Sequence, residues 1–552
     1  MKHRTSRLVS ILLALCLALA LLPGTALAAG GPEKSINFSR QAYSVGYHAS
    51  TVTSYLYENE DGGLTRVEYN YDSGKLVTEK YDSSFRFLSG QRIPVELDIW
   101  GGFFAGETCN FFVFGQKNKE EDDNKEVIRV VKYSKDWQRL GQASLCGANT
   151  TIPFDAGSLR FAEYDGMLYI RTSHELYKSS DGKNHQKYLA LAVRESDMTV
   201  TDSAHDLING GAGYVSHSFN QFILVDREQR IVALDHGDAW PRAAVLNVFA
   251  AKAGTENITR GEAKAVNIQR FPGSIGDNTT GASLGGLAET ASGYVAAYTY
   301  DGAGKSNTAA DRSVYFAYVD KESLRVTTKA ISDIGATTPV LAPTGTDGGY
   351  ILWNTCKANG YTPTDTLYYV RYSADGSVGE VKTATAALSD CQPIVYNGKV
   401  VWYTTNYTSP TCYQLDESGV TAVETDTPPD VFVTVNGREV TWTYAKPFID
   451  ENGRTMVPLS ALSAYLYLGY GWDADNRVAT FSDWGGSKVI HFTIGSPVAK
   501  TYTRTNGDGE IRMDTAAIIV SDRTYVPTRV LAEFFGYTVN WDGASRTVII
   551  TG

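Results

Sequence analysis

RTYVPTRVLAEFFGYTVNWD occupies residues 523–542, and a similar stretch, RTMVPLSALSAYLYLGYGWD, occupies residues 454–473. Three pairs of landmarks are each separated by 69 positions: Pro458 and Pro527, Trp472 and Trp541, and Arg477 and Arg546. A constant offset over three landmarks indicates two copies of one structural unit.

Each copy has the pattern of a strand, a short helix and a hairpin. A short strand, TMVP in one copy and TYVP in the other, ends at a proline, which is tolerated where a helix begins because its missing N–H would be unpaired there. Apolar residues then recur at helical spacing, namely Leu459, Leu462 and Leu466 in the first copy and Val530, Leu531, Phe534 and Phe535 in the second. Trp-Asp opens the closing hairpin, and we expect both tryptophans to pack in the core.

These residues resemble the copper amine oxidase N-terminal-like, or stalk, domain of secreted bacterial proteins. Its hallmark is a strand, V-P-hydrophobic-R, a short amphipathic helix, Gly-hydrophobic and W-D. The second copy carries Val526, Pro527, Arg529, Glu533, Gly536, Trp541 and Asp542, whereas Ser460 and Ala464 replace the Arg and the Glu in the first. VTVNGREV (433–440) and FTIGSPVA (492–499) are similar to opening strands of the two copies. The resemblance implies a spacer or surface-associated unit.

Amine oxidase activity is not expected. The catalytic part of such enzymes has a quinone-forming tyrosine in T-x-x-N-Y-[DE] and copper-binding histidines that include H-x-H. Asn70-Tyr71-Asp72 supplies the last three letters, but Val67 occupies the Thr position and no H-x-H occurs. Since redox-active copper needs correctly spaced imidazoles, we expect no metal, no cofactor and no catalytic residue of this class.

The first 28 residues read as a secretory signal. Lys2, Arg4 and Arg7 precede an apolar run from Leu8 to Leu22, and Ala26-Leu27-Ala28 fits a cleavage site. The run is too short for a good membrane span, and no second one follows. We therefore expect a secreted protein, extracellular or wall-associated, without a membrane span after cleavage.

Residues 36–425 consist of short β-like runs separated by turn pairs such as Asp165-Gly166 and Asn397-Gly398. Four segments place a Gly just before an apolar strand: YDGMLYIRT (164–172), SGYVAAYTY (292–300), GGYILWNT (348–355) and YNGKVVWYT (396–404). Strands recurring in units of about 50 residues are typical of a β-propeller, here with about six or seven blades. An array of β-sandwiches is the alternative.

The expected fold class is therefore mainly β, a propeller followed by a small duplicated α+β module. A proline-containing acidic stretch marks the boundary as a linker at residues 426–430. The module spans residues 431–552, with its copies at about 431–483 and 489–552.

Composition limits the partners. The chain has 552 residues and a net charge of −11, and no basic stripe points to nucleic acid. Five cysteines remain beyond the signal: Cys109, Cys146, Cys356, Cys391 and Cys412. An odd, sparse set without C-x-x-C is neither a disulfide framework nor a zinc site. One or two bridges among the last three, or buried free thiols, both fit the spacing.

Histidines and other polar residues gather in the middle of the β-rich part. The candidate ligand-binding residues are His174, His185, His217, His236, Asp238, Trp240 and Arg242. They would converge if their loops opened on one propeller face, whose central opening is a natural pocket. Histidines in strands also often satisfy backbone groups, so a structural role is the competing interpretation.

The expected function is an exported binding or structural protein. The propeller would present a ligand-binding face, and the module would provide spacing or association with a wall or extracellular polymer, or with a surface protein. The alternative is a secreted propeller enzyme, a hydrolase or lyase acting on glycans through the His/Asp cluster.

Overall fold

The computed structural model describes residues 49–552 except 72–73, 208–217, 240, 256–262, 275–276, 307, 334, 405–409, 425–430, 443–446, 451–452, 521–522 and 544. The signal, the linker, His217 and Trp240 therefore lie outside the described residues. The fold is mainly β, as expected. No helix in the described part of the chain is long and apolar enough to cross a membrane.

The described residues before position 425 form seven antiparallel sheets, each with its strands in sequence order. The first three sheets are formed by β1 (Ser54–Glu58), β2 (Leu64–Asn70), β3 (Lys75–Tyr81) and β4 (Phe87–Ile93); by β5 (Ile99–Ala105), β6 (Cys109–Gly115), β7 (Glu126–Ser134) and β8 (Arg139–Cys146); and by β10 (Arg160–Tyr164), β11 (Met167–Lys178), β12 (Asn184–Arg194) and β13 (Thr199–Leu207), with β9 (Thr150–Pro153) added on β11.

The other four sheets repeat the four-stranded order. They comprise β14 (Ser218–Val225), β15 (Arg230–Gly237), β16 (Ala243–Lys252) and β17 (Ala263–Arg270); β18 (Ala282–Glu289), β19 (Gly293–Tyr300), β20 (Ser313–Asp320) and β21 (Val326–Ala330); β22 (Val340–Pro343), β23 (Gly348–Cys356), β24 (Pro363–Ser373) and β25 (Lys382–Thr385); and β26 (Ile394–Tyr396), β27 (Lys399–Thr404), β28 (Thr411–Asp416) and β29 (Gly419–Glu424). A 3-10 turn, η2 (Ala309–Asp311), precedes β20.

The repeated Gly-apolar segments have one structural role. They become β11, β19, β23 and β27, the second strand of the third, fifth, sixth and seventh sheets. The turn pairs before β11 and β27 have positive φ at both positions, +50° and +72° at Asp165-Gly166 and +50° and +73° at Asn397-Gly398. This conformation suits the tight turn of a two-residue hairpin and favours Asn, Asp and Gly.

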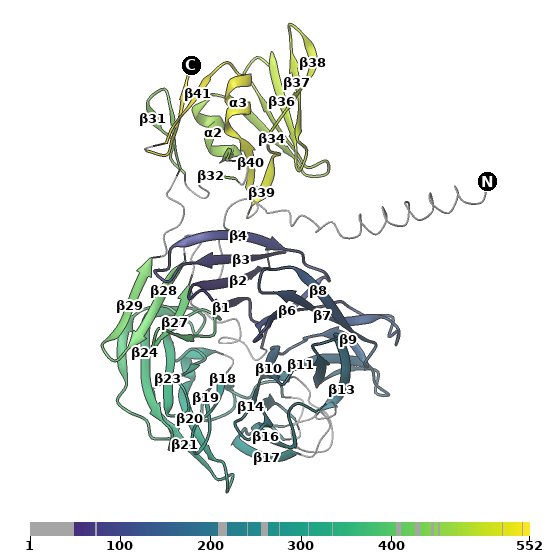
Figure 1. Cartoon of the computed structure of the whole chain (residues 1–552), viewed down its shortest axis with the longest axis vertical. Coiled ribbons are helices and arrows are strands. Elements are labelled where there is room, and N and C mark those ends of the chain that lie inside the picture. The colour runs from purple at the N-terminus through teal and green to yellow at the C-terminus, as the bar shows by residue number, and fades with distance from the viewer. Residues whose placement is uncertain are drawn as a thin grey trace, which may run out of the picture.

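Hydrophobic cores lie between sheets, one for every consecutive pair. Phe112 and Trp100 of the second sheet share a cluster with Val67 of the first, and comparable clusters join each later pair. The seventh sheet packs back on the first, where Tyr403 and Val401 share a cluster with Leu56 and Leu64. Figure 1 shows the sheets following one another from purple through teal to green.

Polar contacts reinforce the junction between the first and seventh sheets. The Tyr403 hydroxyl donates to Glu68 Oε2 at 2.7 Å, and the Arg66 guanidinium lies 5.2 Å from the Tyr403 ring centre. Arg66 also donates to Glu79 Oε2 at 2.6 Å. Because these charges are buried, their mutual pairing is required for stability.

The C-terminal module combines two short helices with three sheets. α2 (Leu459–Tyr465) and α3 (Thr528–Phe534) begin after Pro458 and Pro527, as the sequence predicts. The sheets are β31 (Arg438–Glu439), β30 (Phe432–Val435), β42 (Thr547–Thr551) and β41 (Thr538–Asp542); β32 (Phe448–Ile449), β33 (Thr455–Pro458), β40 (Arg523–Pro527) and β39 (Ile518–Val520); and β34 (Gly469–Asp473), β35 (Val478–Ser482), β36 (Lys488–Thr493), β37 (Val498–Thr503) and β38 (Gly507–Arg512).

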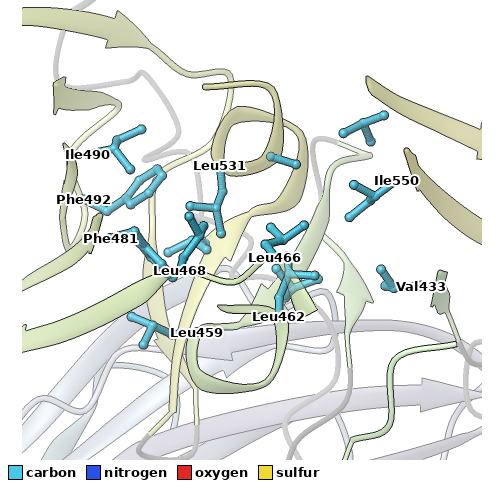
Figure 2. Packing of buried hydrophobic residues seen from close by; sticks show 14 of the residues in the cluster. Val433, Leu459, Leu462, Leu466, Leu468, Phe481, Ile490, Phe492, Leu531 and Ile550 are labelled. Carbon is cyan, nitrogen blue, oxygen red and sulfur yellow. The ribbon is translucent and has the colours of Figure 1, made fainter. Parts of the chain in front are cut away.

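The two copies are interlocked rather than stacked as separate units. β33 of the first copy pairs with β40 of the second, and β30, at the start of the module, pairs in parallel with β42 at its end. The side chains of both copies fill one hydrophobic cluster, in which Leu462 of α2 and Leu531 of α3 are fully buried (Figure 2). Neither copy therefore has a core of its own.

One sequence expectation for the module is wrong. Trp472 and Trp541 do not fill the core, since 43 % and 41 % of their surfaces are exposed. They lie on β34 and β41 at the edges of their sheets, and other side chains of the two copies fill the shared core.

Candidate functional site

The predicted polar cluster lies at one end of two neighbouring sheets. His174 lies in the second half of β11 and His185 at the start of β12, whereas His236 is the last residue but one of β15 and Arg242 precedes β16. His174 and His185 thus flank the β11–β12 connection of the third sheet. His236 and Arg242 flank the β15–β16 connection of the fourth, and both connections join the second strand to the third. Five of the seven candidates fall among the described residues.

A buried ion pair that the sequence did not reveal joins these two sheets. Arg171 donates from Nε and Nη2 to the two oxygens of Asp235, at 2.7 and 2.6 Å, and Asn247 Nδ2 donates to the same carboxylate at 2.8 Å. This bidentate pair connects β11 to β15 and fixes their relative position. No local motif distinguishes Arg171 or Asp235 from surface charges in the sequence.

His174 is a structural histidine. Its Nε2 donates to the carbonyl of His205 at 2.8 Å, and its Nδ1 lies 2.6 Å from Thr150 Oγ1. Burial lowers its pKa to about 3, so the ring is neutral at physiological pH. It joins β11 to β9 and β13 and has no surface available to a ligand.

His236 is equally enclosed. Its Nε2 lies 2.8 Å from Thr280 Oγ1, and its ring packs 5.1 Å from that of Phe271. Burial, with the positive charges of Arg312 and Arg242, lowers its pKa to about 3. A histidine that stays neutral and covered is poorly suited to general acid–base catalysis near pH 7.

Arg242 holds the loop before β18 in place. Its guanidinium donates to the carbonyls of Asp238 at 2.9 Å, Thr279 at 2.8 Å and Pro272 at 3.2 Å. Asp238 is fully buried beside it. His185, in contrast, lies near the surface and its Nε2 is 2.9 Å from Asp181 Oδ2 in the β11–β12 turn. The candidates thus shape two loops, and His185 alone among the described ones lies near solvent.

A cleft of about 560 Å³ opens on the C-terminal module. Both copies build it: the β32–β33 hairpin of the first copy forms one side, and the start of α3 with the β41–β42 hairpin forms the other. Thr528 Oγ1 donates to the carbonyl of Thr455 at 2.7 Å and ties the start of α3 to β33. Because these walls come from both copies, the cleft depends on their interlocking.

The cleft combines an exposed ring with charged planar groups. Trp541 lines it together with Arg454, Arg529 and Asp514. Arg454 donates to Asp514 Oδ2 from Nε at 2.9 Å and from Nη2 at 2.6 Å, so that both side chains are oriented at the surface. An indole face beside guanidinium and carboxylate groups provides apolar contact and directional hydrogen bonds, as ligand sites require.

Sequence reasoning singled out Trp541 and Arg529 as parts of the repeated motif but assigned them to the scaffold. It missed Arg454, Asp514 and the cleft itself. One sequence feature could have pointed to Arg454: each of the two repeated stretches begins with an arginine, Arg454 and Arg523. The pairing with Asp514, 60 positions further along, is set only by tertiary structure.

The described residues contain no group of three or more His, Cys, Asp or Glu side chains placed to hold a metal ion. The five cysteines among the described residues are free thiols, and Cys109, Cys391 and Cys412 are buried. Tyr71 of the Asn-Tyr-Asp sequence is half exposed at the β2–β3 turn, and its hydroxyl lies 2.6 Å from Thr51 Oγ1.

Residues 434–550 match the family described as copper amine oxidase N-terminal domain, which confirms the resemblance of the repeated module. Among curated proteins, none matches this chain.

Solved structures that match part of this chain include the BP39L lectin of Burkholderia pseudomallei, with 9 % identity, coverage of 68 % of this chain and 96 % of the lectin, and a TM-score of 0.40. The Aleuria aurantia lectin has 12 % identity, covers 72 % and 99 %, and scores 0.34. The α-L-arabinofuranosidase of Fusarium graminearum has 10 % identity, covers 64 % and 99 %, and scores 0.36. At such TM-scores these similarities identify neither a fold nor a ligand.

Proposed function

We propose that this chain is an exported, noncatalytic binding protein whose C-terminal module attaches it to a wall or extracellular glycan. Residues 1–28 would direct export, and residues 36–425 would form a seven-bladed β-propeller. Strand order 1-2-3-4 in every sheet, with a core between each consecutive pair and between the last and the first, supports this assignment.

The observation that carries the attachment role is the cleft around Trp541. Trp541 is 41 % exposed and lines the cleft, so part of its ring is available to contact a ligand. Here it borders a cleft with Arg454 and Asp514, whose planar groups suit the hydroxyls and charges of a saccharide. The module would thus act as a binding unit as well as a spacer.

The propeller would present a second ligand face at the β11–β12 and β15–β16 connections. His174, His236, Asp238 and Arg242 would shape these loops from within, and His185 would lie nearest to the ligand. This arrangement favours binding over the alternative of a glycan hydrolase or lyase, because the two buried histidines are neutral and covered.

Co-sedimentation with purified cell-wall material tests the attachment role. We expect residues 29–552 to pellet, and we expect Trp541→Ala to reduce the bound fraction about tenfold, the effect of losing ~1.4 kcal/mol of contact. Trp472→Ala is the matched control, because Trp472 is the equivalent, equally exposed ring of the first copy and does not line the cleft.

A truncation ending at residue 424 should stay in the supernatant. If residues 29–552 also stay there, the attachment role is wrong. If Trp472→Ala and Trp541→Ala reduce binding equally, the binding surface lies elsewhere on the module.

A further inference from the structure

The charge of the cleft differs from that of the chain. The module at 431–552 has 11 Lys and Arg against 12 Asp and Glu, a net charge of −1, so residues 1–430 account for −10 of the total of −11. Within the module, the charged residues that line the cleft are Arg454, Arg529, Arg546 and Asp514. The cleft is therefore a positively charged surface on an acidic protein.

Arg529 is the cation most available to a ligand. Its side chain is 62 % exposed, and Glu533, its ion-pair partner one helical turn away, lies at 3.8 Å. Such an exposed pair has a small interaction energy and is easily exchanged for a better acceptor. Arg454, in contrast, already donates from Nη2 to Asp514 Oδ2 at 2.6 Å. This hydrogen bond shows that its guanidinium is oriented to donate to an anionic oxygen.

The two copies differ at the position of Arg529, so only the second copy has an arginine there. Ser460 replaces Arg529 in the first copy, and Ala464 replaces Glu533, whereas the tryptophan is present in both. The tryptophan therefore belongs to the shared unit, whereas the guanidinium of Arg529 is present only in the second copy, which supplies α3 and Trp541 to the cleft.

We propose that the cleft binds an anionic saccharide polymer, one that carries carboxylate or phosphodiester groups. This inference rests on the proposed attachment role and specifies its ligand. Trp541 contacts the apolar face of a sugar ring, while Arg529 and Arg546 neutralise its acidic groups. An acidic protein repels an anionic polymer over most of its surface, so attachment is confined to the cleft and weakens as salt screens it.

The test measures binding of residues 29–552 to three soluble polymers: a polyuronate, a poly(glycerol phosphate) and neutral dextran. We expect binding to one or both anionic polymers, at least tenfold stronger than binding to dextran and lost at about 0.5 M NaCl, where the screening length falls to a few ångströms. The polyuronate and poly(glycerol phosphate) arms tell carboxylate recognition from phosphodiester recognition.

Arg529→Gln should weaken anionic binding about tenfold and flatten its salt dependence, whereas Arg512→Gln, an exposed arginine on β38 outside the cleft, should not. Both sites are exposed, so both variants should fold, as circular dichroism would verify.

The outcomes separate the two proposals. Wall pelleting that is insensitive to salt and to Arg529→Gln, with dextran bound as well as the anionic polymers, would overturn the anionic ligand and leave the attachment role intact. Failure to pellet with wall material at all would overturn the attachment role itself.

Discussion

A pair of carboxyl groups stands out at the scale of single residues. Glu195 follows β12, is almost fully buried and interacts with Glu163 of β10. Burial, reinforced by the charge of Glu163, raises the pKa of Glu195 to about 7. Glu163 is itself held in place because the backbone N–H of Glu107, in the second sheet, donates to its Oε2 at 2.7 Å.

This pair predicts a pH-dependent stability. Since the folded-state pKa of Glu195 exceeds its ordinary value of 4.5, the protonated form is favoured by folding. The contribution of Glu195 to the free energy of unfolding is complete below about pH 4.5 and is lost as the pH rises through 7. Glu195→Gln should therefore stabilise the protein at pH 8, by about 1 kcal/mol after allowance for solvent screening, and have little effect at pH 4.5.

Denaturant unfolding at the two pH values measures this difference, with the exposed Glu417→Gln as control. An equal effect of Glu195→Gln at both pH values would contradict the raised pKa.

At the scale of elements, the module shows how a duplication becomes a single folding unit. α2 and α3 are seven residues each, too short to be stable alone, and derive their stability from packing. Leu462 and Leu531 occupy equivalent positions, 69 residues apart, and both are fully buried in the same cluster (Figure 2). A change in one helix should therefore affect both copies.

Leu462→Ala and Leu531→Ala test this coupling. Each should lower the free energy of unfolding of the module by about 2–5 kcal/mol, because each leaves a cavity in the shared core. Hydrogen exchange should accelerate in both β34–β35 and β41–β42 for either variant. Tyr467→Ala, at a 73 % exposed site, is the control. Acceleration confined to the mutated copy would show that the copies unfold independently.

At the scale of the whole molecule, the junction between the first and seventh sheets joins residues more than 300 positions apart. Tyr403 belongs to β27, and its hydroxyl donates to Glu68 on β2. The module lies beyond β3 and β4 in Figure 1, and Lys75 Nζ on β3 donates to the carbonyl of Ile519 at 3.1 Å. The first sheet thus contacts both the seventh sheet and the module.

Tyr403→Phe should destabilise the seven-sheet part by about 1–3 kcal/mol, since it removes a donor from the buried Glu68 carboxylate. Thermal unfolding and hydrogen exchange in β2 and β27 would measure it, with the exposed Tyr361→Phe as control. Unchanged thermal unfolding and unchanged hydrogen exchange in β2 and β27 would mean that the Glu68 carboxylate does not need the hydrogen bond from Tyr403.

Features that depend on local spacing could be predicted without the structure. They are the duplication at 69 residues, the helices after Pro458 and Pro527, the mainly β fold and the recurring second strands, because these follow from periodicity, proline geometry and turn chemistry. Tertiary structure decided burial and partners. The packing of sheets encloses His174 and His236 and leaves Trp472 and Trp541 partly exposed. The tertiary structure also pairs Arg454 with Asp514 and places both beside Trp541 in one cleft. These outcomes depend on which strand lies at an edge and which sheet covers it, and long-range pairing leaves no local trace in the sequence.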